Sequence, residues 1–182
     1  FKYLIQKAKK TKFGKDHNFD KIFNHQDFIK YVPIRDYEKI KSYIEKVKKG
    51  EPNILWQGKP LYFSKTSGTT SGVKYIPISK ESISTHINSA RDAILSYIYY
   101  SGNAKIFFGK QIFLQGSPIL KTINGIKIGR LSGIVAHHVP KYLQRSRMPT
   151  WNTNCIEDWE KKVEKIVEET LVENMTIIGG IP

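Results

Sequence analysis

The most informative stretch of the sequence is residues 61–79, which read LYFSKTSGTTSGVKYIPIS. Two short apolar runs flank a segment made of Ser, Thr and Gly. Gly68 and Gly72 allow positive φ and close backbone approach, so several amide N–H groups can converge on one anion. Lys74 adds a positive point charge beside them. The composition therefore predicts a polyphosphate-binding loop.

The residues predicted to hold the phosphates are small or carry a hydrogen-bond donor. They are Thr66, Ser67, Gly68, Thr69, Thr70, Ser71, Gly72 and Lys74. Their spacing is not the Walker pattern, which has four residues between the glycines and a Gly directly before the Lys. A hairpin turn rich in Ser and Thr, with no ligand, is the competing interpretation. Composition alone leaves both open.

The segment Thr66–Pro77 resembles the phosphate-binding signature of the acyl-adenylate-forming enzymes, the superfamily of firefly luciferase and the acyl-CoA synthetases. It is most similar to the auxin- and jasmonate-conjugating acyl-acid amido synthetases, also called the auxin-responsive promoter family. That branch carries Ser/Thr-Ser-Gly-Thr-Thr/Ser, a short gap, Gly, a Lys and then Tyr-Ile-Pro. The likeness extends to TKFG at residues 11–14, VPIRDYE at 32–38 and GEPNILW at 50–56.

The resemblance implies an α/β fold, the N-terminal part of an adenylate-forming large domain, with helices followed by alternating strands and helices. Residues 1–182 are then an incomplete N-terminal portion of a single adenylation domain. Residues 1–60 form a helical lead-in, and residues 61–182 form an α/β part with the phosphate loop. Family members are longer, and their later motifs for ATP, metal and ribose do not occur here. We therefore expect a fragment that is catalytically incomplete by itself.

The activity that the resemblance implies is that of an ATP-dependent ligase. Such an enzyme activates a carboxylic acid as an acyl-adenylate and transfers the acyl group to an amine, usually of an amino acid. Lys74 is the implied catalytic residue, because it would offset the charge on the departing pyrophosphate. ATP and Mg²⁺ are the implied cofactors, with the metal ligand expected outside these residues. By the same resemblance, Ser132 and Gly133 are candidates for lining the acyl pocket.

Two rival functions remain open. One is another adenylate-forming ligase that makes a thioester, and the other is a basic, non-enzymatic module that binds nucleic acid or a partner protein. The formal net charge is +14, and residues 1–50 hold 14 Lys/Arg against 6 Asp/Glu. A Lys-rich surface can attract nucleic acid, but lysines scattered along amphipathic helices are typical of solvated faces. The pattern therefore disfavours nucleic-acid binding.

Cysteine content and hydropathy bear on the compartment. Cys155 is the single cysteine, so no internal disulfide can form, which fits a reducing cytosol. No apolar run approaches 18 residues, and the first residues lack the apolar core of a signal peptide. We expect a cytoplasmic protein without a membrane segment. Its expected partners are a small-molecule carboxylic acid and an amine, whose identities and the oligomeric state the sequence leaves open.

Helix signals are clear at several places. A basic N-terminal helix is expected to end at Gly14. Asp36 is expected to cap a helix that ends at Gly50, which we interpret as scaffold only. A longer helical pattern runs from about residue 80 to 100 and is expected to end at Gly102. Its expected buried stripe is Ile83, Ile87, Ala90, Ile94 and Ile98. Another helical pattern covers residues 157–173.

Strand signals lie in the second half of the chain. Residues 110–116 predict a buried strand, and Asn124-Gly125 predicts the turn of a hairpin over residues 121–129. Residues 145–149 are predicted to be an irregular connection. His137-His138 is expected on an extended segment, where adjacent side chains point to opposite faces, so structural histidines are favoured over a metal pair or a general base.

Overall fold

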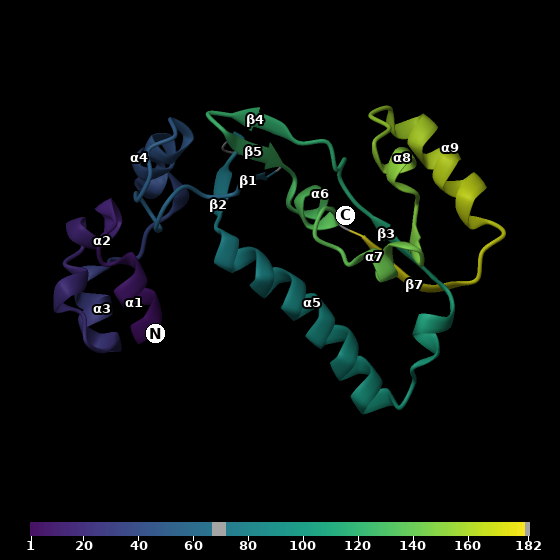
Figure 1. The fold of residues 1–182 in the computed structure, drawn as a ribbon, viewed down its shortest axis with the longest axis horizontal. Helices are drawn as coiled ribbons and strands as arrows, with labels where there is room; N and C mark the ends of the chain where they lie inside the picture. The colour runs from purple at the N-terminus through teal and green to yellow at the C-terminus, as the bar shows by residue number, and fades with distance from the viewer. Residues whose placement is uncertain (67–71, 181–182) are drawn as a thin grey trace. The chain divides into compact units, whose positions relative to one another are not determined.

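A computed structural model describes residues 1–66 and 72–180 of the chain, drawn as a ribbon in Figure 1. These residues form two compact units. The first unit comprises Phe1–Lys80 and Lys121–Ile128, and the second comprises Glu81–Leu120 and the chain from Gly129 onward. The predicted division of one adenylation domain into residues 1–60 and 61–182 remains a prediction.

Two of the short helices that begin the first unit have side-chain caps. The hydroxyl of Thr11 accepts the Gly14 N–H at 3.0 Å, and Asn24 forms a reciprocal capping box with Asp27. Such caps satisfy the backbone donors that a helix start leaves without an intrahelical partner. The elements are α1 (Lys2–Ala8), α2 (Lys12–Asp16), the 3-10 turn η1 (Phe19–Lys21), α3 (His25–Tyr31) and α4 (Tyr37–Lys48).

The prediction that Gly14 ends the first helix is wrong. Helix α1 already ends at Ala8, and Gly14 lies inside α2. A Cβ atom on Gly14 would lie 2.2 Å from the carbonyl oxygen of Ala8. Gly14 is therefore required by the close approach of two helices, and not by a helix end.

The first unit also contains a four-stranded sheet in the order β2-β1-β5-β4, whose strands lie side by side in Figure 1. β1 (Tyr62–Lys65) pairs antiparallel with β2 (Tyr75–Ile78), and β4 (Lys121–Ile123) pairs antiparallel with β5 (Ile126–Gly129). Asn124 and Gly125 form the predicted turn, with φ of 50° and 80°. Positive φ at both central residues is what a two-residue hairpin turn of this kind demands.

Helix α4 packs on this sheet and forms the main core of the first unit. Ile44 and Val47 of α4 are buried against Phe63 of β1 and against Ile126 and Ile128 of β5. Full burial of one such side chain contributes roughly 1.5–3 kcal/mol. The core therefore fixes the helix to the strand that enters the predicted phosphate loop.

The second unit alternates helices with strands. Its sheet has the order β6-β3-β7, and β3 pairs parallel with both neighbours. Parallel strands joined by helical crossovers are the mark of an α/β architecture. The elements are α5 (Lys80–Ser101), η2 (Lys105–Phe108), β3 (Lys110–Leu114), α6 (Leu131–Ala136), α7 (Lys141–Gln144), β6 (Arg147–Met148), α8 (Trp151–Asn154), α9 (Trp159–Thr170) and β7 (Met175–Gly180).

Helix α5 confirms the predicted long helix, and Gly102 follows it with φ of 65°. Of its predicted apolar stripe only Ile83 is buried, while Ala90 is exposed. In the described part of the chain, no helix combines the length and the apolar composition needed to cross a membrane.

Several segments of the second unit differ from the prediction. β3 forms, but its side chains are half-buried or exposed and not buried as predicted. Residues 145–149, predicted as irregular, contribute the short strand β6 beside β3. Residues 131–136 form helix α6 where an extended segment leading to the histidines was expected, so His137 is the residue at its C-terminal end.

Candidate functional site

The predicted phosphate loop joins β1 to β2. The ladder between these strands pairs Lys65 with Tyr75, and the Thr66 N–H then donates to the carbonyl oxygen of Lys74 at 3.1 Å. Thr66 and Lys74 therefore lie opposite each other at the mouth of the hairpin, and the Thr66 amide is used in closing it. The candidates Ser67, Gly68, Thr69, Thr70 and Ser71 lie outside the described residues.

Gly72 lies on the Lys74 side of the hairpin mouth. Its φ is 76°, as expected for a glycine that bends the backbone, and no atom of the described residues lies within 4 Å of where its Cβ would be. A side chain at this φ would be strained, so the position favours glycine. A role for Gly72 in phosphate binding stays a prediction.

Lys74 is half-buried, and its ammonium lies against an aromatic ring. The Nζ atom is 5.7 Å from the centroid of the Tyr37 ring, within the range of a cation–π contact. Among the described residues, no carboxylate forms an ion pair with Lys74. Its positive charge is therefore held in place without being neutralised by the described chain.

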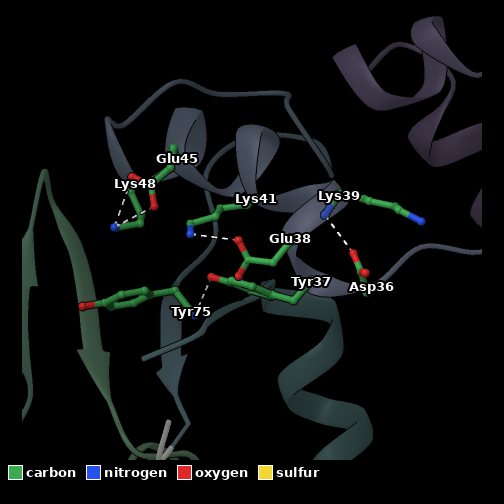
Figure 2. A network of polar contacts seen from close by, with 8 residues as sticks. All are labelled: Asp36, Tyr37, Glu38, Lys39, Lys41, Glu45, Lys48 and Tyr75. Atoms are coloured by element: carbon green, nitrogen blue, oxygen red, sulfur yellow. Dashed lines mark hydrogen bonds and ion pairs between the residues drawn. The ribbon is translucent and has the colours of Figure 1, made fainter. Parts of the chain in front are cut away.

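Tyr37 contacts the hairpin a second time through its hydroxyl group. The Tyr75 N–H donates to the Tyr37 hydroxyl oxygen at 2.9 Å, as the dashed line in Figure 2 shows. Tyr37 is the first residue of α4, and the carboxylate of Asp36 caps this helix by accepting the Lys39 N–H at 3.0 Å. The cap fixes the helix start from which the tyrosine reaches β2.

The far end of α4 also contacts β2. Lys48 Nζ lies 4.4 Å from the ring centroid of Tyr75 and 2.9 Å from a carboxylate oxygen of Glu45 (Figure 2). The ring of Phe63 on β1 meets Tyr75 edge to face at 6.1 Å. The start of β2 is thus held by both ends of one helix and by its neighbouring strand.

The acyl-pocket candidates Ser132 and Gly133 lie in α6 of the second unit and are buried. The Ser132 hydroxyl accepts the Gly116 N–H at 3.1 Å, and a Cβ on Gly133 would lie 2.3 Å from the Ser117 carbonyl oxygen. Both residues therefore hold α6 tightly against the chain that follows β3. Their role in binding an acid stays a prediction.

The second unit contains a cavity of about 1040 Å³. Its walls are mostly apolar, with Ile87 and Ile94 from α5 and Val135 from α6, and with Arg91 and Arg145 among the polar residues. Ser132 and Gly133 are not among the described residues that line it. Val135 comes from the same helix as the two candidates.

The adjacent histidines lie at the end of α6. His137 Nε2 is 2.8 Å from the Pro118 carbonyl oxygen, and its ring meets Trp151 edge to face at 5.0 Å. These contacts support a structural role for His137. Within the residues that the structure describes, no three His, Cys, Asp or Glu side chains gather as metal ligands would.

A buried polar cluster in the second unit was not predicted from the sequence. Lys162 of α9 is 5% exposed, and its Nζ donates to the carbonyl oxygens of Asn154 at 2.9 Å and Gln115 at 3.4 Å. Burial lowers the pKa of the Lys162 ammonium, and it also lowers the pKa of the Arg147 guanidinium, which donates to the Gln115 side chain. Lys162 precedes the buried Ile166 by four residues, so helical spacing places both on the buried face of α9. This signal was missed because lysine is charged and was expected to be exposed.

Tyr37 is the residue near the loop whose contacts sequence reasoning missed, because α4 was interpreted as scaffold only. The available signal was the VPIRDYE segment, residues 32–38, which carries part of the family resemblance. Periodicity places Tyr37 on the apolar side of α4, but it does not reveal a partner 37 residues further along the chain.

Comparison with known proteins identifies a family and relatives that match most or part of this chain. The GH3 family N-terminal domain matches residues 1–167. Indole-3-acetic acid-amido synthetase GH3.15 from Arabidopsis thaliana is 37% identical over 107 residues, which cover 57% of this chain and 18% of that protein.

Two solved structures share the fold. GH3.15 acyl acid amido synthetase has a TM-score of 0.71 at 18% identity, covering 88% of this chain and 28% of that one. AtGH3.15 acyl acid amido synthetase in complex with 2,4-DB has a TM-score of 0.68 at 22% identity, covering 86% and 27%. This chain spans less than a third of each relative's length. The fold predicted from the resemblance is confirmed, and because the family match covers residues 1–167, the chain belongs to the GH3 family.

Proposed function

We propose that the protein containing this chain is an ATP-dependent acyl acid amido synthetase. It activates a carboxylic acid as an acyl-adenylate and transfers the acyl group to an amine, an amino acid in the first instance. The observation that carries the proposal is the match to the GH3 family N-terminal domain over residues 1–167. The hydrogen bond from the Thr66 N–H to the Lys74 carbonyl oxygen supports it, together with a Lys74 ammonium that no described carboxylate neutralises.

The loop is assigned to the phosphates of ATP. The amides and hydroxyls of residues 67–72 hold the β- and γ-phosphates, together with the hydroxyl of Thr66. The positive φ of Gly72 fits a polyanionic ligand, and so does Lys74 at the hairpin mouth, which has no ion pair with any described residue. Mg²⁺ accompanies the nucleotide, and its protein ligand is assigned outside residues 1–182.

The chemistry follows from the weakness of carboxylates as acylating agents. A carboxylate oxygen attacks the α-phosphorus of ATP, and the bond from that phosphorus to the bridging oxygen breaks as pyrophosphate leaves. The amine nitrogen then attacks the acyl carbon, and AMP leaves. Lys74 offsets the negative charge that grows on the departing pyrophosphate. An already ionised carboxylate needs no general base for the first step.

Further assignments belong to the same proposal. Ser132 and Gly133 line or support the acyl pocket, and the reaction takes place in the cytoplasm. The partners are small molecules, a carboxylic acid and an amine, and no nucleic acid is needed.

Carboxylate-dependent exchange of labelled pyrophosphate into ATP tests the proposal, with the intact gene product. Lys74→Ala should lower this exchange by about 100-fold, the usual loss when one charge-stabilising contact is removed. Lys39→Ala is the matched control, because it removes the same charge from an exposed side chain that points away from Tyr75 in Figure 2. Equal losses in both variants would contradict the assignment of Lys74.

Acceptor specificity separates the proposal from its rivals. Stable amide product with an amino acid supports the amido synthetase, whereas product only with a thiol acceptor supports a thioester-forming ligase. Tight nucleic-acid binding with a steep salt dependence and no exchange supports a binding module.

A further inference from the structure

The first residue of α4 makes two different contacts with two consecutive residues of the loop hairpin. The Tyr37 hydroxyl accepts the Tyr75 N–H at 2.9 Å, and the Tyr37 ring lies 5.7 Å from Lys74 Nζ. One side chain therefore restrains both the backbone that follows Lys74 and the ammonium group at the end of its side chain.

The nature of the contact matters for a lysine that must act on phosphates. A lysine side chain has a flexible stem of four carbons and needs a partner to hold its ammonium in one place. A carboxylate partner would neutralise the charge, and Lys74 has none among the described residues. An uncharged aromatic face attracts the ammonium while leaving its full charge available to an anion.

Tyr37 is itself well anchored. Asp36 caps the helix at its side, and Ile44 and Val47 fix the same helix to the sheet. Lys48, at the other end of α4, lies over the ring of Tyr75. The tyrosine thus projects from a rigid support toward the start of β2, which is what a positioning group requires.

We propose that Tyr37 is a positioning residue for Lys74, which holds the ammonium at the hairpin mouth where the leaving pyrophosphate requires positive charge. The inference rests on the proposed function for its effect on catalysis. The Tyr37–Lys74 contact itself is measurable without any activity.

The contact is tested by competitive acylation of lysines in the intact gene product, followed by mass spectrometry. Tyr37→Leu should raise the labelling rate of Lys74, relative to Lys39 in the same sample, by roughly two- to fivefold, the factor that an exposed cation–π contact is worth. Tyr37→Phe keeps the ring and should leave the rate near that of the unaltered protein. An unchanged Lys74 rate in Tyr37→Leu overturns the inference.

The catalytic effect is tested by a double-mutant cycle in the pyrophosphate exchange assay. Tyr37→Leu should lower kcat by roughly tenfold with little change in the KM for ATP, because a misplaced group loses effect in the transition state. In a Lys74→Ala background the same substitution should have almost no further effect. An equal loss in both backgrounds indicates a general structural role and overturns the inference.

The matched control is Tyr43 on the same helix. Its hydroxyl is also hydrogen-bonded, to Asp16 at 2.8 Å, whereas the Lys74 ammonium lies over the ring of Tyr37. Tyr43→Leu should leave both the Lys74 labelling rate and the coupling to Lys74 unchanged, and a matching change in this variant overturns the inference. Absence of exchange in the unaltered protein contradicts the proposed function, while the labelling result still decides whether Tyr37 holds Lys74.

Discussion

The sheets of the two units differ in how well they are covered. In the first unit Phe63 of β1 is 1% exposed beneath α4. In the second unit Phe113 of β3 is 36% exposed and Ile178 of β7 is 77% exposed. All three are large apolar residues in strands, so the difference lies in what packs against them and not in strand composition.

The comparison shows which sheet is stabilised by packing within the described chain. The core around Phe63 surrounds the strand that enters the candidate loop, so the hairpin mouth rests on a well-packed support. The strands of the second unit keep apolar faces that the described residues leave open. Substitutions should therefore have unequal effects in the two units, and the following predictions test that inequality.

The largest effect is expected for truncation in the covered sheet. Phe63→Ala should destabilise the first unit by about 3–5 kcal/mol, because it removes a fully buried ring and leaves a cavity. Phe113→Ala should have a clearly smaller effect, since its ring is partly solvated already. Both effects can be measured as local opening free energies, from amide hydrogen exchange in β1 and β3. Similar losses of stability at Phe63 and Phe113 would contradict the expected difference between the two sheets.

A smaller effect is expected where helices meet in the first unit. Gly14→Ala should destabilise α1 and α2 by about 1–3 kcal/mol, because the new methyl group collides with the Ala8 carbonyl oxygen. The hydrogen exchange of residues 2–16 gives the measurement. Gly58→Ala is an informative control, because its φ of 73° disfavours alanine although nothing lies within 4 Å. The destabilisation by Gly58→Ala should come from backbone strain, so the faster hydrogen exchange should be confined to the loop around residue 58.

The smallest expected effect is a pH dependence of stability that comes from the buried lysine of the second unit. Burial lowers the pKa of Lys162 below its ordinary value of 10.5, so the unfolded chain binds more protons than the folded chain at alkaline pH. Stability should therefore rise as the pH increases toward 10.5, within the window between the folded and unfolded pKa values.

Lys162→Met tests this dependence, because it keeps a long side chain and removes the proton-binding group. Hydrogen exchange of α9, followed across the alkaline range and corrected for the intrinsic exchange rate, should lose its upward slope in the variant. Lys161→Met removes an exposed lysine of the same helix and should keep the slope. If Lys162→Met retains the full slope, another titrating group is responsible for the pH dependence.

Local chemistry explains the parts of the fold that were predictable. The cap at Asp36, the turn at Asn124-Gly125 and the helix end at Gly102 each depend on residues within a few positions of one another. The position of the candidate loop between two apolar runs was predictable for the same reason, and those runs form β1 and β2. The α/β class followed from the resemblance and is confirmed.

Long-range packing explains the parts that were not predictable. Gly14 was expected to end a helix, but Ala8 of the preceding helix occupies the space beside it. The chain before His137 was expected to be extended, but its helix packs against residues 116–118. In both places the local pattern allowed more than one structure, and contacts from another segment selected one.

The sequence by itself determined that a Gly-, Ser- and Thr-rich segment with a lysine behind it lies between two short apolar runs, because this pattern is a property of near neighbours. Only the tertiary structure decided that Tyr37 meets Lys74 and Tyr75, and that Lys162 is buried beside Asn154. These pairings join residues from separate elements. No local pattern specifies them, because they arise when whole helices pack against sheets.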